Sequence, residues 1–339
     1  MNKRIGPRTV QFEHPPIILS TASAAGKAER EGPYGAEMDI AVEDDLWGEK
    51  TYELAERKLL VKVAEAAIAR AGLKADDISY MLAGDLLNQI ISSGFAARQL
   101  GLPYIGLYGA CSTMSESMMV GSMIVDGGFA NYLLCATSSH FATAERQFRL
   151  PLELGTPKTP TSQNTATASG ALILSSVRDT AYPAVTYATT GRVVDFGVND
   201  VSNMGAAMAP AAAETILSHL QETGRTPDYY DHIITGDLGT FGSQMLSEIV
   251  EAAGTPLPNH LDCGAMIYAG NDKMHCGGSG CGCSASMFCG HFYKRMMDGA
   301  ISRVLFVATG ALHSPTSTLQ GETVPSIAHA VAIEMGGGV

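Results

Sequence analysis

Apolar and polar positions alternate along the first half of the chain in a pattern that predicts helices and strands in turn. Residues 49–72 place apolar side chains at helical spacing and end on a glycine, so this stretch predicts a helix. The short apolar run over 78–84 predicts a buried strand. After it we expect a helix over about 90–100, a strand over 103–110, a helix over 111–127 that opens on a Ser/Thr cap, a strand over 131–139, a Pro- and Thr-rich surface loop over 150–168, and a closing strand over 169–176.

The second half of the chain repeats the first. Residues 77–86 (DISYMLAGDL) are matched by 229–238 (YYDHIITGDL), with Asp85 and Asp237 in equivalent positions. Three further pairs follow in the same order: 110–115 with 282–287, 126–139 with 298–311, and 169–176 with 328–335. Because two of these pairs share one offset without a gap, we infer a duplicated structure, with an N-terminal half over 1–180 and a C-terminal half over 181–339.

The alternation of strands and helices within each copy predicts an α/β fold with mainly parallel sheets covered by helices. Ligands of such folds bind beyond the carboxyl ends of the strands. Cys111 and Cys283 fall at that place in the two copies, at matching strand-to-helix junctions. We therefore expect a functional site where these junctions meet.

Composition narrows the class of protein. The 339 residues are 46% hydrophobic and 17% charged, which is enough to bury a sizeable core. The net charge of −12, without a basic stripe, argues against nucleic acid as a partner. No apolar run reaches the roughly 18 residues that a membrane-spanning helix needs. Seven cysteines, an odd number, are typical of thiols in a reducing compartment, so we expect a cytoplasmic protein.

Cys111 is the first candidate for chemistry. A thiol at the start of a helix lies near the positive end of the helix dipole and near unpaired amide groups, which favour the thiolate form. The alternative is a small buried residue, because free cysteine is among the most buried residue types. The residue's position alone leaves both interpretations open.

A second candidate is the stretch 275–291, which is unusually rich in possible metal ligands. Metal sites usually combine paired CxxC units, whereas this stretch has CxxxxCxC, and the duplication already accounts for Cys283 as the partner of Cys111. We therefore favour glycine-assisted backbone packing around a pocket over a metal or redox site. The residues concerned are His275, Cys276, Cys281, Cys283, Cys289 and His291.

Charged residues near the strand ends give further candidates. His140 follows a predicted strand, with Arg146 and Arg149 nearby, which suggests acid–base work or recognition of an anion. A capped strand end with solvated arginines explains the same residues. Asp85 and Asp237 occupy repeated GDL positions, and repetition favours a turn or cap role over catalysis.

Several unusual segments carry a resemblance to a known family. They are FEHP (12–15), LAGDLLNQ (82–89), GACST (109–113), VDGGFA (125–130), ATSSH with ATAERQFR (136–149), MAPAAA (208–213), GGSGC (277–281) and VATGAL (307–312). A duplicated βαβ unit with a cysteine heading the third helix of its first half resembles the thiolase and ketoacyl-synthase superfamily. In detail the segments resemble the stage V sporulation protein AD family of spore-forming Firmicutes.

This resemblance carries expectations of its own. It implies a duplicated thiolase-like fold, layered α-β-α-β-α with two pseudo-symmetric halves, a homodimer, and a role in spore formation. It also implies binding of dipicolinic acid (pyridine-2,6-dicarboxylic acid) without a cofactor. The implied partners are other proteins of the stage V A operon at the inner forespore membrane, which move this acid into the developing spore. Attachment to that membrane would be peripheral, through those partners.

The chain departs from the condensing enzymes of the superfamily at two positions. Those enzymes carry a His-Gln-Ala-Asn segment where Gly236 and Asp237 stand here, and a later asparagine where this chain has GGSGCGC. Each lost donor to a developing enolate is worth about 3 kcal/mol. Non-catalytic binding is therefore favoured, with Cys111 as a vestigial nucleophile. An active acyltransferase using Cys111 stays the alternative, because CGGSGCG (276–282) superficially resembles the C-terminal cysteine segment of thiolases.

Dipicolinate is a planar dianion at neutral pH. Two helix N-termini that converge on one cleft form an anion site without many basic side chains. His140 and Arg149 are the candidates to add charge. The full set of expected ligand-binding residues is Cys111, Ser112, Thr113, His140, Arg149, Asp237, Gly280 and Ser284.

Overall fold

The first half of the chain forms the helices and strands that its pattern predicts. The computed structural model describes residues 3–148 and 158–336. The first half comprises β2 (Ile17–Ala25), α2 (Tyr52–Arg70), β4 (Tyr80–Gly84), α3 (Ile91–Leu100), β5 (Tyr104–Gly106), α4 (Thr113–Asp126), β6 (Tyr132–Ser139) and β8 (Ala168–Ser175). The predicted elements are confirmed to within a few residues, except that β5 is shorter than expected. The chain leaves β5 for a turn in which Ala110 has a positive φ of 50°.

The second half repeats the same order. It comprises β9 (Pro183–Thr189), α6 (Met204–Thr223), β10 (His232–Thr235), α7 (Gly239–Ala252), β11 (His260–Asp262), α9 (Cys281–Met287), β13 (Arg303–Ala311) and β14 (Ser326–Met335). α9 continues through a π-helical turn (Phe288–Phe292) into α10 (Tyr293–Met297). The shorter elements are β1 (Thr9–Gln11), α1 (Lys27–Arg30), β3 (Ile40–Ala41), α5 (Phe141–Phe148), β7 (Asn164–Thr165), α8 (Cys263–Ile267), β12 (Gly278–Ser279) and α11 (Pro315–Leu319). The boundary between the halves at residue 180 stays a prediction.

The strands join in the order β11-β10-β13-β14-β9-β2-β8-β6-β4-β5. β4 pairs in parallel with β5 and β6, and β10 does so with β11 and β13. β8 and β14 run antiparallel to their neighbours, so the expectation of mainly parallel sheets is wrong and the sheet is mixed. Antiparallel neighbours are joined at one end of the sheet, so the connections β6–β8 and β13–β14 remain at the carboxyl ends of β6 and β13. There they build the walls of the site described below.

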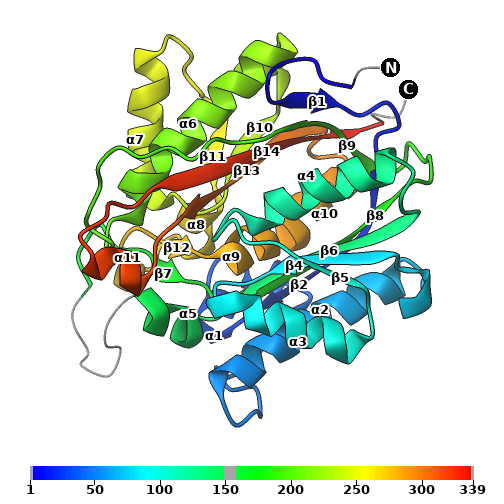
Figure 1. The fold of residues 1–339 in the computed structure, drawn as a ribbon, viewed down its shortest axis with the longest axis horizontal. Coiled ribbons are helices and arrows are strands. Elements are labelled where there is room, and N and C mark those ends of the chain that lie inside the picture. Colours follow the sequence, from blue (N-terminus) through cyan, green and yellow to red (C-terminus); the bar gives the residue numbers. More distant parts are fainter. Residues whose placement is uncertain (1–2, 149–157, 337–339) are drawn as a thin grey trace.

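The elements stack in five layers (Figure 1). α2 and α3 cover the outer face of the first half's strands, and α6 and α7 cover the outer face of the second half's strands. α4, α9 and α10 lie between the two sets of strands. The two outer cores and the central core match these helical layers, as expected for the α-β-α-β-α arrangement.

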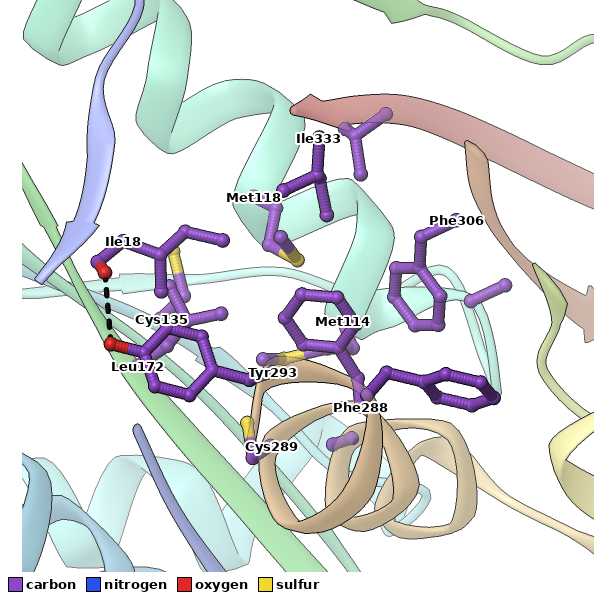
Figure 2. Packing of buried hydrophobic residues seen from close by; sticks show 14 of the residues in the cluster. Ile18, Met114, Met118, Cys135, Leu172, Phe288, Cys289, Tyr293, Phe306 and Ile333 are labelled. Carbon is purple, nitrogen blue, oxygen red and sulfur yellow. Dashed lines mark hydrogen bonds between the residues drawn. The ribbon is translucent and has the colours of Figure 1, made fainter. Parts of the chain in front are cut away.

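Alternation along each strand explains why both faces are apolar. On β13, Val304 and Phe306 point into the central core, whereas Leu305 and Val307 pack under α6. Figure 2 shows the central core, where Phe306 and Phe288 lie with ring centroids 5.0 Å apart. Strands buried on both faces therefore appear in the sequence as continuous apolar runs.

One segment that the sequence assigned to the surface is partly buried. Of the predicted loop over 150–168, residues 150–157 lie outside the described residues, and β7 in the remainder pairs in parallel with β12. Gln163 and Ala166 are fully buried. The surface prediction is wrong here because this segment lies at the carboxyl end of β6 and the amino end of β8 and supplies a short strand that pairs with the second half.

None of the helices in the described part of the chain has both the length and the apolar character needed to cross a bilayer.

Candidate functional site

The junctions before α4 and α9 meet at the carboxyl ends of the strands. Cys111 stands two residues before α4, and its Sγ lies 3.7 Å from the Oγ of Ser279, which stands two residues before α9. In Figure 1 α4 and α9 lie near the centre of the molecule, between the two sets of strands. The site therefore draws its side chains from both copies of the repeat, as the sequence predicts.

The two repeated cysteines are not placed alike. α9 begins at Cys281, so Cys283 lies inside the helix rather than at the junction before it. Its thiol is fully buried and points to the carbonyl oxygen of Gly236, 3.8 Å away. The prediction of matching junctions is therefore wrong for Cys283, because the second copy starts its helix four residues earlier. Only Cys111 reaches the site.

Asp237 faces the thiol of Cys111. It follows β10 and is fully buried, and Thr309 Oγ1 donates to its Oδ1 at 2.5 Å. Ser279 Oγ and the amide of Gly280 both lie 3.4 Å from its Oδ2. Burial raises the pKa of Asp237 to about 7, against the opposing effect of the hydrogen bond from Thr309. This buried carboxyl, which has few strong donors, is therefore neutral at pH values below about 7.

The thiol of Cys111 is correspondingly hard to ionise. Burial raises its pKa well above the usual value, and the facing Asp237 raises it further. These two effects outweigh the helix end, which the sequence alone suggested would favour the thiolate. Cys111 is therefore a neutral thiol at neutral pH.

The equivalent aspartate of the first half does different work. Asp85 accepts hydrogen bonds from the amides of Leu87 and Ser93, at 2.9 and 2.7 Å, and from the hydroxyl of Ser93. It fixes the turn that leads into α3, in agreement with the predicted turn or cap role. In the second half Asp262 caps the equivalent turn, accepting from the amides of Leu238 and Gly239 at 2.8 Å each. Asp237 is therefore left to face Cys111.

A small cavity of about 70 Å³ ends at Cys111, and an outer cavity of about 480 Å³ adjoins it. The two cavities share lining residues from both halves, so they form one cleft that leads from the surface to the thiol. Among the described residues that line them there is no lysine or arginine. The shared residues are Asn88, Tyr108, His313 and Ser314; the inner part adds Gln147, Thr165 and Ser279.

Two of the hydroxyls predicted around Cys111 form hydrogen bonds with backbone carbonyl oxygens. Ser112 Oγ donates to the carbonyl oxygen of Gly109, and Thr113 Oγ1 donates to that of Ala110, both at 2.7 Å. Ser112 occupies the cap position of α4, but its side chain makes no capping hydrogen bond, so that part of the prediction is wrong. These side chains hold the turn that presents Cys111.

Two other predicted residues lie on the α9 side. Gly280 has a φ of 107°, and a Cβ there would stand 2.8 Å from Ser139 Oγ, so this position requires glycine. Ser284 is fully buried behind Gly236, and its Oγ has no hydrogen-bond partner among the described residues. Gly280 contributes its amide to Asp237, whereas Ser284 does not line the cleft.

His140 is not part of the cleft. Its ring is fully buried, with Nε2 2.8 Å from the carbonyl oxygen of Asp45 and stacked on Phe141. Burial lowers its pKa, so the ring is neutral at neutral pH. Arg146 lies over the ring of Tyr52 and pairs with Glu53. Arg149, the other expected source of charge, lies outside the described residues.

The cleft contains polar residues that sequence reasoning missed, among them Asn88, Gln147 and His313. Gln147 comes from α5, and the backbone amide of Asn88 donates to Gln147 Oε1 at 2.9 Å. The repeat held the signal for His313, because β6 and β13 are equivalent strands and each is followed within two residues by a histidine. The chain places the histidine after β13 in the cleft and the one after β6 in the core.

The thiols of the cysteine-rich stretch point to separate backbone carbonyls. Cys276 points to Pro160, Cys281 to Ser138 and Cys289 to Ala171. Within residues 3–148 and 158–336, no group of three or more His, Cys, Asp or Glu side chains is placed to hold a metal ion.

Comparison with known proteins adds a family to this geometry. A family model described as stage V sporulation protein AD matches residues 6–334. Stage V sporulation protein AD of Bacillus subtilis (strain 168) is 45% identical over 337 residues, which cover 99% of this chain and 99% of that protein.

Solved structures agree on the fold. OleA from Xanthomonas campestris, in a co-crystal with cerulenin, superposes with a TM-score of 0.62 at 11% identity, over 96% of this chain and 97% of that one. The tetronic acid condensing enzyme AbyA1 gives 0.59 at 17% identity, and 3-oxoacyl-[acyl-carrier-protein] synthase III from Aquifex aeolicus VF5 gives 0.57 at 12%. Each of these two covers 94% of this chain and is itself covered to 99%. At such identities the likeness concerns the thiolase-like fold alone.

Proposed function

The chain belongs to the stage V sporulation protein AD family, a family of sporulation proteins, and on that premise we propose that it binds dipicolinic acid without transforming it. The ligand would occupy the cleft that ends at Cys111. By binding it, the protein supports the uptake of dipicolinate into the forespore.

The observation that carries this proposal is the set of groups around Cys111. Its thiol faces Asp237 and Ser279 rather than a histidine and an asparagine. A condensing reaction needs a nucleophilic thiolate and two donors for the developing enolate. A neutral thiol beside a carboxyl supplies neither, which supports binding over catalysis.

The lining of the cleft suits a small planar acid. It offers neutral hydrogen-bond donors on several sides: the side-chain amide groups of Asn88 and Gln147 and the hydroxyls of Tyr108, Thr165 and Ser279. Carboxylates accept several hydrogen bonds each, and a few well-placed polar groups fix the orientation of a ligand in such a site.

Calorimetric titration with dipicolinate tests the proposal, with pyridine-3,5-dicarboxylate as the matched control. The two isomers carry the same charge and differ only in where the carboxylates point. We expect heat of binding with the 2,6-isomer and far weaker binding with the 3,5-isomer. Equal binding of both, or no binding of either, would contradict the proposal.

We also propose that the protein is a homodimer formed through the edge strand β5. β5 ends the sheet with unpaired backbone groups, and an exposed apolar group surrounds it, consisting of Ile91, Phe95, Ile105 and Tyr108. Sedimentation equilibrium should give twice the chain mass, and Ile105→Lys should shift it to the chain mass. A monomeric wild type would contradict this proposal.

The remaining expectations stay proposals. The partners would be other proteins of the stage V A operon at the inner forespore membrane, and the protein would be attached to that membrane through them. Cross-linking in sporulating cells, followed by mass spectrometry, tests both statements. Recovery of the protein with the membrane fraction when the operon's membrane proteins are deleted would contradict attachment through partners.

An acyltransferase using Cys111 is the second candidate, because the thiol does lie at the inner end of a cleft. Incubation with radiolabelled acyl-coenzyme A tests it. Transfer of the label to Cys111, followed by its release on turnover, would favour the acyltransferase over the binding proposal. A protein that takes up no label and still binds dipicolinate would support the binding proposal.

A further inference from the structure

Gln147 brings a side-chain amide to the inner part of the cleft. It lies in the last turn of α5 and lines the cavity of about 70 Å³ that ends at Cys111. Its Oε1 accepts a hydrogen bond from the backbone amide of Asn88 at 2.9 Å. Because a backbone N–H can only donate, the oxygen and not the nitrogen of this side chain must face Asn88. The orientation of the Gln147 carboxamide is therefore fixed.

The segment before α3, which contains Asn88, is itself held in place. The amide of Leu87 donates to Asp85 Oδ1 at 2.9 Å, and the amide of Ile90 donates to the carbonyl oxygen of Leu87 at 2.9 Å. Gln89 and Ile90 have positive φ angles of 55° and 47°. Residues other than glycine, and β-branched ones above all, keep such a backbone only where the surrounding structure holds them in it. The segment therefore presents a fixed donor to the oxygen of Gln147.

The amide nitrogen of Gln147 is left for a ligand. It has no hydrogen-bond partner among the described residues, and it can donate two hydrogen bonds but accept none. Other polar side chains at the inner cavity are less selective. The hydroxyls of Thr165 and Ser279 can donate or accept, and within the described part of the chain no hydrogen bond fixes the carboxamide of Asn88. At Gln147 a ligand therefore meets a group that favours acceptors and disfavours donors.

We propose that Gln147 is a specificity-determining residue of the cleft, and that its amide nitrogen donates to a carboxylate of a planar aromatic dicarboxylate. The inference rests on the proposed function, because it assigns a residue to the recognition of the same ligand. Hydrogen bonds to a charged acceptor are shorter and stronger than those to a neutral one. A carboxylate is therefore preferred at this place over a neutral carboxamide of the same shape.

Two variants and two ligands test the assignment. Gln147→Glu keeps the shape of the side chain and can still accept from the amide of Asn88, but it offers the ligand an acceptor in place of the donor. Gln147→Met removes the donor without adding charge. The second ligand is pyridine-2,6-dicarboxamide, which has the shape of dipicolinate without its charges. The matched control is Gln221→Glu, which adds the same negative charge at an exposed position of α6 that does not line the cleft.

By calorimetry, both Gln147 variants should bind dipicolinate at least about tenfold more weakly than the wild type, because a hydrogen bond to a charged group is lost. The wild type's preference for dipicolinate over the dicarboxamide should shrink in Gln147→Met. It should reverse in Gln147→Glu, whose carboxylate accepts from the amide groups of the second ligand. Gln221→Glu should bind as the wild type does. Thermal unfolding of each variant verifies that it is folded, and the reversal in the glutamate variant keeps the test decisive if the methionine variant is not.

Wild-type affinity in Gln147→Met would overturn the assignment while leaving the proposed function intact, because the loss in the glutamate variant would then be repulsion alone. Equal losses for both ligands in Gln147→Met would also overturn it, because Gln147 would then only hold the segment around Asn88. An unchanged ligand preference in Gln147→Glu would contradict it as well. If the wild type itself does not bind dipicolinate, the proposed function fails and this inference fails with it.

Discussion

The two GDL turns of the repeat show that one sequence motif can have two structural roles. Asp85 lies among tight donors, with two backbone amides and a hydroxyl within 2.9 Å. Asp237 has one short hydrogen bond, from Thr309, and two contacts at 3.4 Å. The first aspartate stabilises its own turn. In the second half Asp262 accepts the hydrogen bonds of the equivalent turn, so Asp237 does not cap it.

This difference shows that the duplication determines where each aspartate lies in the fold but not which groups its side chain contacts. The neighbours of each copy decide whether the buried carboxyl caps a turn or faces the thiol of Cys111.

Replacing Asp85 should cost the most stability. Asp85→Ala leaves two buried backbone amides without acceptors, so the free energy of unfolding should fall by about 3 kcal/mol. At pH 5 Asp237→Asn should lower it by less than about 1 kcal/mol, since the folded protein then holds Asp237 largely neutral. Urea denaturation at pH 5 measures both, with the exposed Asp76→Ala as the control. Equal losses in the two variants would show that both aspartates act as caps.

The pH dependence of stability should next show the cost of ionising the buried Asp237. Burial raises the pKa of Asp237 in the folded protein to about 7, above its value of about 3.9 in an unfolded chain. A raised folded-state pKa contributes stability that is fully present below the unfolded value and is lost as the pH rises through the folded value. Between pH 5 and pH 7, Asp237→Asn should therefore gain on the order of 2–3 kcal/mol relative to the wild type. A constant difference between the two proteins over this range would mean that Asp237 has an ordinary pKa.

Of the two aspartates, only Asp237 should affect the reactivity of Cys111. The facing carboxyl raises the pKa of the thiol, so Asp237→Asn should increase the thiolate fraction and speed alkylation of Cys111 by about tenfold at pH 8. Mass spectrometry of the Cys111 peptide after timed exposure to iodoacetamide measures the rate. Asp85→Asn is the matched control and should leave it unchanged. The same rate in all three proteins would remove Asp237 from the environment of the thiol.

The smallest effect is expected from the thiol itself. Cys111→Ala should weaken dipicolinate binding by less than about threefold, because a neutral thiol contributes only a weak hydrogen bond. Calorimetric titration of the variant gives the ratio. A collapse of binding would mean that the thiol is a principal contact of the ligand.

Much of this fold follows from sequence patterning. The buried strands appear as apolar runs because residues such as Val304 and Leu305 face different cores on opposite sides of one sheet. The internal repeat gives the order of the elements and brings Cys111 and Asp237 to one site. What it did not give is the partial burial of the loop around Gln163, because pairing between β7 and β12 depends on residues far apart in the chain.

The position of the site could be predicted from the sequence, but the side chains that line it could not. His140 and His313 follow equivalent strands, and nothing local distinguishes the histidine that stacks in a core from the one that lines a cleft. The acceptor at Asp45 and the loop before α11 make that choice, and both come from tertiary packing. The ionisation of Cys111 likewise depends on a carboxyl 126 positions away in the sequence, at residue 237.

The central claim is that the cleft at Cys111 binds a dicarboxylate and leaves it unchanged. A crystal structure of the protein with dipicolinate tests this most directly. We predict the intact ligand in the cleft, in contact with Asn88 and Gln147, with an unmodified thiol at Cys111. An acyl group on Cys111, or dipicolinate bound only outside this cleft, would contradict the account.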